Sequence, residues 1–127
     1  YLGYNFKITD LQALLGLEQL NDIKLRISKK KAIFLRYKNN LQRNSKIKFF
    51  EISKNETPWS VDIYLKDVRK LKKILEKNKI LTRYVYPPLN SQKIYKKFTN
   101  LPISNYFCKR GLWLPSSLDL KNYEIYR

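Results

Sequence analysis

The chain has 127 residues, 43% of them hydrophobic, which is enough for one domain with a modest core. It carries 27 Lys and Arg against 10 Asp and Glu, a formal net charge of +17, and it has no histidine, which excludes histidine-ligated metal sites and Ser-His or Cys-His nucleophile pairs. Its one cysteine, Cys108, excludes an internal disulfide and suits a reducing compartment, so we expect a cytoplasmic protein with no metal site.

Two features of the sequence concern its origin and its surroundings. It contains no methionine and opens on Tyr1, so we expect it to be part of a longer protein. No apolar run reaches the length of a membrane span and no signal-peptide pattern opens the chain, so we expect no membrane contact.

The first predicted element is a long helix. Thr9, Asp10, Leu11 and Gln12 form a capping box, in which the Thr9 hydroxyl and the Gln12 side chain each bond the other residue's backbone N–H. Leucines then recur on a wide face, and no proline or glycine interrupts residues 17–43. The pattern predicts one long helix, broken at most once, near Asn21-Asp22.

The start of this helix is apolar nearly all round, which is typical of a helix whose second side is covered by a partner. Gly16 costs a helix about 1 kcal/mol relative to alanine. Beside Ala13 it makes a small-residue surface that another backbone can approach closely. Packing within the same subunit and packing against a partner explain Gly16 equally well.

The rest of the chain alternates short strands and helices. The expected elements are strands over residues 46–52, 59–65, 80–86 and 112–114, and helices over 67–78, 103–110 and 119–127, with a turn or two of helix around 92–98. Asp67 is expected to cap the first of these helices. Few strands are separated by clean crossover helices, so the order favours a small α+β domain with a largely antiparallel sheet.

The lysine runs at 29–31 and 71–79 alternate with apolar residues at helical spacing, so we interpret them as solvated faces of helices. The alternative is a basic nucleic-acid-binding module, because ten Tyr, six Phe and two Trp among many lysines can form stacking platforms. No recognised nucleic-acid motif appears, so we expect no nucleic-acid partner.

Three segments resemble one known family. They are Gly3 to Leu20 (GYNFKITDLQALLGLEQL), Thr82 to Phe98 (TRYVYPPLNSQKIYKKF) and Asn100 to Leu120 (NLPISNYFCKRGLWLPSSLDL). In this order they are similar to segments of the DegT/StrS family of fold-type I, pyridoxal-phosphate-dependent nucleotide-sugar aminotransferases. The resemblance implies the small C-terminal α+β domain of that fold, with a long entry helix. Residues 1–20 would then be the junction with a large cofactor-binding domain, and 21–127 the small domain.

The resemblance also implies site residues. Asn5, in loop 3–8, would contact the cofactor phosphate of the neighbouring subunit in a homodimer with shared active sites; the alternative is a turn residue that stabilises its own backbone. Lys7 stands where the family commonly has arginine, so it keeps the charge but loses the bidentate fork. Arg83 and Tyr86 would lie near the substrate's nucleotide or sugar. Asn90 replaces the usual histidine, which leaves hydrogen bonding but no acid or base.

Transamination needs a lysine that holds pyridoxal phosphate as a Schiff base and a carboxylate opposite the pyridine nitrogen. In the family both lie upstream of Tyr1, and no lysine here has the family's Ser-x-x-x-Lys context. We therefore expect this chain alone to be inactive, and the intact protein to move an amino group from glutamate to a nucleotide-linked keto-sugar for polysaccharide synthesis. A non-catalytic dimerisation domain is the remaining alternative.

Overall fold

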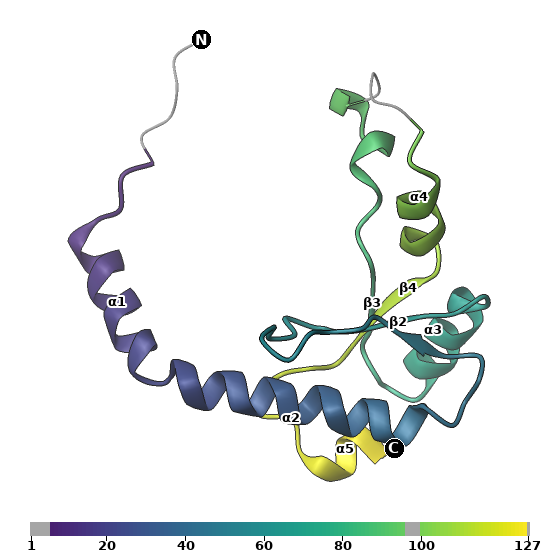
Figure 1. Ribbon diagram of the computed structural model, residues 1–127, viewed down its shortest axis with the longest axis horizontal. Coiled ribbons are helices and arrows are strands. Elements are labelled where there is room, and N and C mark those ends of the chain that lie inside the picture. The colour runs from purple at the N-terminus through teal and green to yellow at the C-terminus, as the bar shows by residue number, and fades with distance from the viewer. Residues whose placement is uncertain (1–5, 96–99, 127) are drawn as a thin grey trace.

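The computed structural model describes residues 6–95 and 100–126 (Figure 1). Its helices are α1 (Asp10–Asn21), α2 (Ile23–Leu41), α3 (Val68–Lys77), α4 (Pro102–Cys108) and α5 (Asn122–Tyr126), with 3-10 turns η1 (Leu89–Ser91) and η2 (Lys93–Tyr95). Its strands are β1 (Lys48–Phe49), β2 (Val61–Tyr64), β3 (Arg83–Tyr84) and β4 (Gly111–Leu114). Helices around one small sheet are the predicted α+β class.

The predicted helix start and helix break are both present. The Thr9 backbone N–H donates to Gln12 Oε1 at 2.9 Å, and the Gln12 backbone N–H donates to Thr9 Oγ1 at 3.3 Å, which confirms the capping box. The chain leaves the helical path at Asp22, between α1 and α2. The predicted long helix is therefore two helices of 12 and 19 residues.

The four strands lie in the order β1-β2-β4-β3, and every neighbouring pair is antiparallel, as predicted. The central pair is the longest and runs from Val61 opposite Leu114 to Tyr64 opposite Gly111. The outer strands β1 and β3 pair over only two residues each, so these two strands are shorter than the expected 46–52 and 80–86.

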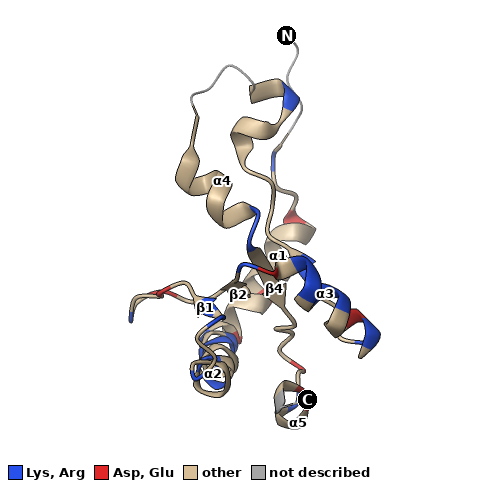
Figure 2. Ribbon diagram, turned by 90° about the vertical axis from the view of Figure 1, so that its right-hand side faces the viewer, with Lys and Arg blue, Asp and Glu red and all other residues tan. Residues whose placement is uncertain are grey.

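One face of the sheet forms the core. Helices α2 and α5 lie on this side, whereas α4 and the two 3-10 turns rise from the other side (Figures 1 and 2). The buried core residues are Ile33, Phe34, Tyr37, Val61, Ile63, Val68, Leu112, Leu114 and Ile125. The strand residues among them are alternate positions of β2 and β4, as the period of two requires.

The second face of the sheet is polar and aromatic. Asp62 and Trp113 lie opposite each other on β2 and β4, and Arg83 lies opposite Trp113 on β3. Further along this face, the Tyr64 ring contacts Phe107 of α4, with ring centroids 5.0 Å apart. Helix α4 thus covers one end of the second face.

One expected cap is wrong. Asp67 occupies the position before α3, but its side chain makes no capping hydrogen bond. Its ψ of 46° lies outside the extended region from which a side chain reaches the first free N–H groups of a helix.

Gly111 allows β4, β3 and α4 to approach one another. A Cβ at this position would lie 2.5 Å from Cγ2 of Val85 and 3.2 Å from the carbonyl oxygen of Phe107. We predict that Gly111→Ala lowers the free energy of unfolding by about 1–3 kcal/mol, measured by urea denaturation, because strand or helix must shift. The matched control is Gly16→Ala, since a Cβ at Gly16 has no neighbour within 4 Å among the described residues. Equal stability of the two variants would contradict the prediction.

Tyr37 makes the stability of the fold depend on pH in the alkaline range. Burial, and secondly the Glu124 carboxylate, raise the pKa of Tyr37 from 10.0 to about 12. Between these values the unfolded chain releases the phenol proton and the folded chain retains it, so stability falls as the pH rises. We predict that the wild type loses stability relative to Tyr37→Phe between about pH 9 and about pH 11.5, measured by urea unfolding. Parallel curves for the two proteins would exclude this.

Candidate functional site

Three side chains of the second sheet face form a cation–aromatic group, which we call the arginine cluster: Arg83, Tyr86 and Trp113. The Arg83 Cζ atom lies 4.7 Å from the centroid of the Tyr86 ring and 5.4 Å from that of the Trp113 ring. The two rings meet edge to face, with centroids 5.0 Å apart. The structure thus brings together the two expected substrate residues, Arg83 and Tyr86.

The arginine cluster holds a guanidinium group in place without neutralising it. Contact with the faces of aromatic rings stabilises the cation by roughly 0.5–2 kcal/mol and restricts its rotamers. Among the residues that the structure describes, Arg83 has no salt bridge. Its planar N–H donors can therefore form the bidentate pair with a phosphate or carboxylate that lysine cannot form.

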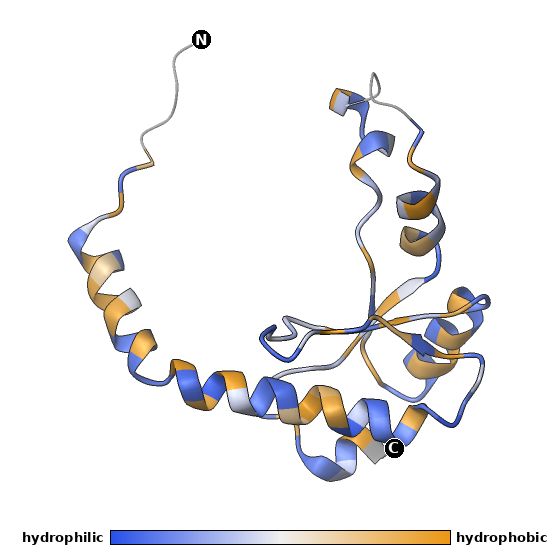
Figure 3. Ribbon diagram, in the orientation of Figure 1, coloured by the Kyte–Doolittle hydropathy of each residue, from blue (hydrophilic) through white to orange (hydrophobic). Residues whose placement is uncertain are grey.

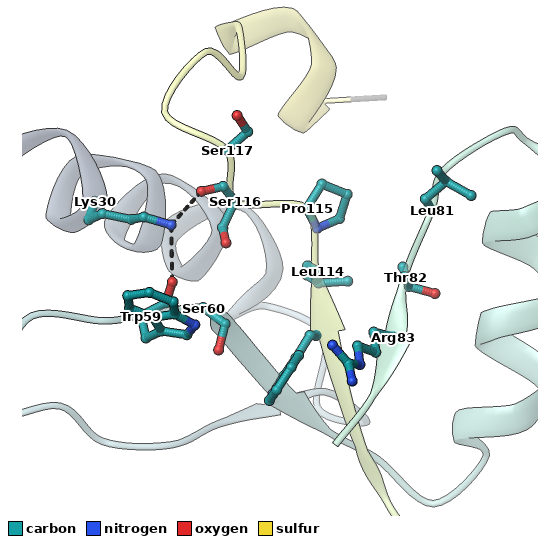
Figure 4. A pocket seen from close by; sticks show the side chains of 11 residues that line it. Lys30, Trp59, Ser60, Leu81, Thr82, Arg83, Leu114, Pro115, Ser116 and Ser117 are labelled. Atoms are coloured by element: carbon teal, nitrogen blue, oxygen red, sulfur yellow. Dashed lines mark hydrogen bonds between the residues drawn. The ribbon is translucent and has the colours of Figure 1, made fainter. Parts of the chain in front are cut away.

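A cleft of about 470 Å³ lies beside the arginine cluster (Figure 4). It is lined by Arg83 and Trp113, by Lys30 of α2, by Trp59 and Ser60 before β2, and by hydroxyl-bearing residues that include Thr82. No carboxylate is among its eleven lining residues. The cleft thus presents two cations, two indole rings and several hydroxyl groups.

Lys30 ties helix α2 to both loops that frame the cleft. Its ammonium group donates to the carbonyl oxygens of Trp59 at 3.0 Å and of Ser116 at 2.7 Å (Figure 4). Burial of the ammonium lowers the pKa of Lys30 below its ordinary value. In the 29–31 run Lys29 is exposed, as expected of a solvated helix face, whereas the Lys30 ammonium is partly buried and bonded to two backbone carbonyls.

Asn90 lies in η1, and its Oδ1 atom is buried without a hydrogen-bond donor among the described residues. Such an acceptor is costly to leave unpaired. The amide of Asn90 can therefore accept a hydrogen bond from a group outside this part of the chain.

The two expected cofactor residues lie at the other end of the chain. Asn5 lies outside the described residues, so its predicted role stays a prediction. Lys7 is exposed in the segment before α1. In Figure 1 this segment stands apart from β3 and β4, the strands that carry Arg83 and Trp113. Within one copy of the chain, Lys7 and Arg83 are not brought together.

Helix α1 is apolar and uncovered. None of its residues is buried, and Figure 3 shows it largely in the colour of hydrophobic residues. Its leucines are exposed by more than half: Leu11 68%, Leu14 64%, Leu15 58%, Leu17 63% and Leu20 59%. The described residues therefore provide no cover for this helix.

Two further findings limit the kind of site. No group of three or more His, Cys, Asp or Glu side chains in residues 6–95 and 100–126 is arranged to hold a metal ion. None of the helices in the described ranges combines the length and apolarity that a membrane crossing requires.

All 127 residues match one protein family, described as the DegT/DnrJ/EryC1/StrS aminotransferases. The chain belongs to this family. Among curated proteins it is 32% identical over 130 residues to GDP-perosamine synthase of Escherichia coli O157:H7, an alignment that covers 98% of this chain and 35% of that protein. It is 34% identical to dTDP-4-amino-4,6-dideoxy-D-glucose transaminase of Escherichia coli, with 97% and 36% covered.

Solved structures of DegT/DnrJ/EryC1/StrS aminotransferases share the fold. DesV from S. venezuelae, in complex with a ketimine intermediate, superposes with a TM-score of 0.87 at 19% identity and covers 95% of this chain and 34% of that one. Helicobacter pylori PseC, an aminotransferase in pseudoaminic acid biosynthesis, gives 0.84 at 21% identity, with 99% and 37% covered. The chain spans about a third of the length of these relatives.

Sequence reasoning missed three residues of the cleft: Lys30, Trp59 and Trp113. A signal existed for Trp113, because it stands between two leucines in a predicted strand, so its side chain must point away from theirs. For Lys30 and Trp59 the local sequence carries no comparable signal, since their roles depend on contacts with distant segments.

The two hydrogen bonds of Lys30 give a stability prediction. Lys30→Met keeps the length of the side chain but leaves the carbonyls of Trp59 and Ser116 without this donor. We predict a loss of about 1–3 kcal/mol in the free energy of unfolding, measured by urea denaturation. The control is Lys29→Met at the exposed neighbouring position, which should change stability by less than about 0.5 kcal/mol. A Lys30→Met protein as stable as the control would show that the two bonds contribute nothing.

Proposed function

We propose that the chain is the C-terminal part of an aminotransferase that moves an amino group from glutamate to a nucleotide-linked keto-sugar, for the synthesis of amino sugars such as those of surface polysaccharides. The observation that carries this proposal is the match of all 127 residues to the aminotransferase family. The curated relatives named above support the nucleotide-sugar substrate, since one is named for a GDP-linked and one for a dTDP-linked sugar.

The proposal divides the chain into two parts. Residues 1–20 form the junction with a large cofactor-binding domain, and residues 21–127 form the small α+β domain. The uncovered leucines of α1 support this division, because an apolar helix outside the core needs a covering surface. The chain spans about a third of the length of the curated relatives, which leaves room in the intact protein for such a surface.

Arg83 is proposed to bind a negatively charged group of the substrate. Its guanidinium is oriented by the rings of Tyr86 and Trp113, so little conformational entropy is lost when a phosphate binds. The Tyr86 ring is 56% exposed and can contact the sugar or nucleotide on its open side. The unpaired Oδ1 of Asn90 can accept a hydrogen bond from a sugar hydroxyl.

The family's aminotransferases depend on pyridoxal phosphate, which when bound supplies the electron sink for moving the amino group. The described residues do not offer it a complete site. Lys30 has a lowered pKa, as a Schiff-base lysine needs, but its ammonium is committed to two backbone carbonyls. We therefore assign the Schiff-base lysine to the large domain, and to Asn5 and Lys7 of this chain only the binding of the cofactor phosphate.

We further propose a homodimer with shared active sites in the cytoplasm. The segment before α1 stands apart from strands β3 and β4 in one chain (Figure 1). If the segment with Lys7 and the arginine cluster both serve active sites, the simplest arrangement is one in which each active site takes the two groups from different copies of the chain. A second copy against α1 would also cover its leucines, and Gly16, with open space around it, would permit a close approach.

Mixing two inactive variants of the full-length protein tests the reaction and the sharing together. One variant lacks the Schiff-base lysine, and the other carries Asn5→Ala with Lys7→Ala. We expect the wild type to aminate a nucleotide-linked keto-sugar with glutamate, and each variant alone to lose at least about 90% of that activity, because a phosphate donor contributes roughly 1.5–3 kcal/mol. After subunit exchange, the mixture should regain part of the activity, since each heterodimer contains one complete site.

Two controls establish that subunits exchange and how much activity can be recovered. Subunit exchange is followed with differently tagged copies, and wild type mixed with either variant gives the upper limit of recovery. No recovery despite exchange would show that the Asn5 loop serves its own subunit. A folded wild type with no amination of any nucleotide-linked keto-sugar would instead favour the non-catalytic dimerisation domain.

A further inference from the structure

We propose that the cleft beside Arg83 binds the nucleoside diphosphate end of the substrate, with the Trp59 indole stacked on the base and with Lys30 and Arg83 facing the diphosphate. The inference rests on the proposed function, because it assigns one end of a nucleotide-linked sugar to this cleft. It adds Trp59 and Lys30, which the resemblance to the family did not point to, to the binding residues.

Trp59 combines an anchored backbone with an uncovered ring. Its carbonyl oxygen accepts a hydrogen bond from Lys30, and the preceding Pro58 is buried, so the backbone at this point is held in place. The side chain is nevertheless 86% exposed. A large aromatic ring fixed at its base and open on its faces offers a stacking surface at low entropic cost.

The charges of the cleft match a diphosphate. The Lys30 ammonium uses two of its three N–H donors on carbonyls, which leaves one donor and a full positive charge. Arg83 faces the same cleft without a salt bridge to any described residue. No carboxylate is among the lining residues, and Asp62, which strand pairing places beside Trp113, accepts a hydrogen bond from the lining residue Ser60.

The shape of the cleft fits the same ligand. Figure 4 shows Trp59 and Arg83 on opposite sides of the cleft, which separates the place of the base from that of one phosphate contact. The volume of about 470 Å³ lies within the range of roughly 300–1,000 Å³ that small-molecule sites occupy.

The alternative occupant of this surface is another part of the protein that packs on Trp59. The two possibilities differ in what a loss of the indole changes. If the indole stacks on a base, its loss weakens the binding of nucleotides but not of phosphates that lack a base. If the indole packs against protein, its loss lowers stability or disturbs assembly, and the binding of all ligands changes alike.

The test measures binding of UDP, dTDP, GDP and inorganic pyrophosphate to the full-length protein by isothermal titration calorimetry. We expect Trp59→Ala to weaken the tightest nucleoside diphosphate by about 5- to 100-fold and to leave pyrophosphate unchanged. Trp59→Phe should recover most of the loss, because it keeps an aromatic face. Arg83→Gln should weaken both ligands. The matched control is Tyr123→Ala, which removes an aromatic ring that is 68% exposed on α5, outside the cleft, and should change neither.

Three results would overturn the inference: a wild type that binds none of the three nucleoside diphosphates, a folded Trp59→Ala variant that binds them as the wild type does, or a variant that loses nucleotide and pyrophosphate equally. Circular dichroism and the oligomeric state, measured for each variant, identify the last case as packing. If nucleoside diphosphates bind as expected but no amino group is transferred, the proposed function fails while the nucleotide cleft stands.

Discussion

Strand β4 lies between β2 and β3, and its leucines, Leu112 and Leu114, are buried on the side that α2 covers. Side chains alternate along a strand, so the residue between these leucines has to face the other way. That residue is Trp113, and antiparallel pairing places Arg83 and Asp62 beside it on the same face. The arginine cluster is therefore a direct consequence of the packing of the core, and the core cannot change register without moving Arg83 to the wrong face.

The sequence predicts the features of the fold that depend on residues close together in the chain. The Thr9–Gln12 capping box and the break at Asp22 are signals within one helical turn, and both were predicted. The hydrogen bonds of Lys30 join residues 29 and 86 positions apart, and a run of three lysines gives no hint of them. Asp67 failed as a cap for a related reason, because its backbone conformation is set by the turn between β2 and α3. The aromatic contacts of Arg83 likewise required the pairing of β3 with β4, which periodicity does not specify.

Some of the excess positive charge makes contacts within the fold, and the rest remains exposed. Lysine and arginine are spread along α2 and α3 (Figure 2), and in the described part of the chain one salt bridge, Lys72 to Glu76, is present. Lys72 also lies 5.4 Å from the centroid of the Tyr84 ring and donates to the Thr82 carbonyl at 3.3 Å. It thereby connects α3 to the short strand that carries Arg83. Most other cations remain available to solvent and to anions, which favours the approach of a negatively charged ligand.

The two tryptophans of this chain both line the same cleft. Their surroundings differ, since Trp59 is 86% exposed, whereas Trp113 is partly buried beneath Arg83 and Tyr86. Indole emission shifts with the polarity of its surroundings and is quenched by stacked rings and nearby charges. The tryptophan fluorescence of this chain therefore comes from one cleft, with a water-exposed and a shielded indole. The domain carries a built-in optical reporter of whatever enters the cleft, and no label needs to be attached.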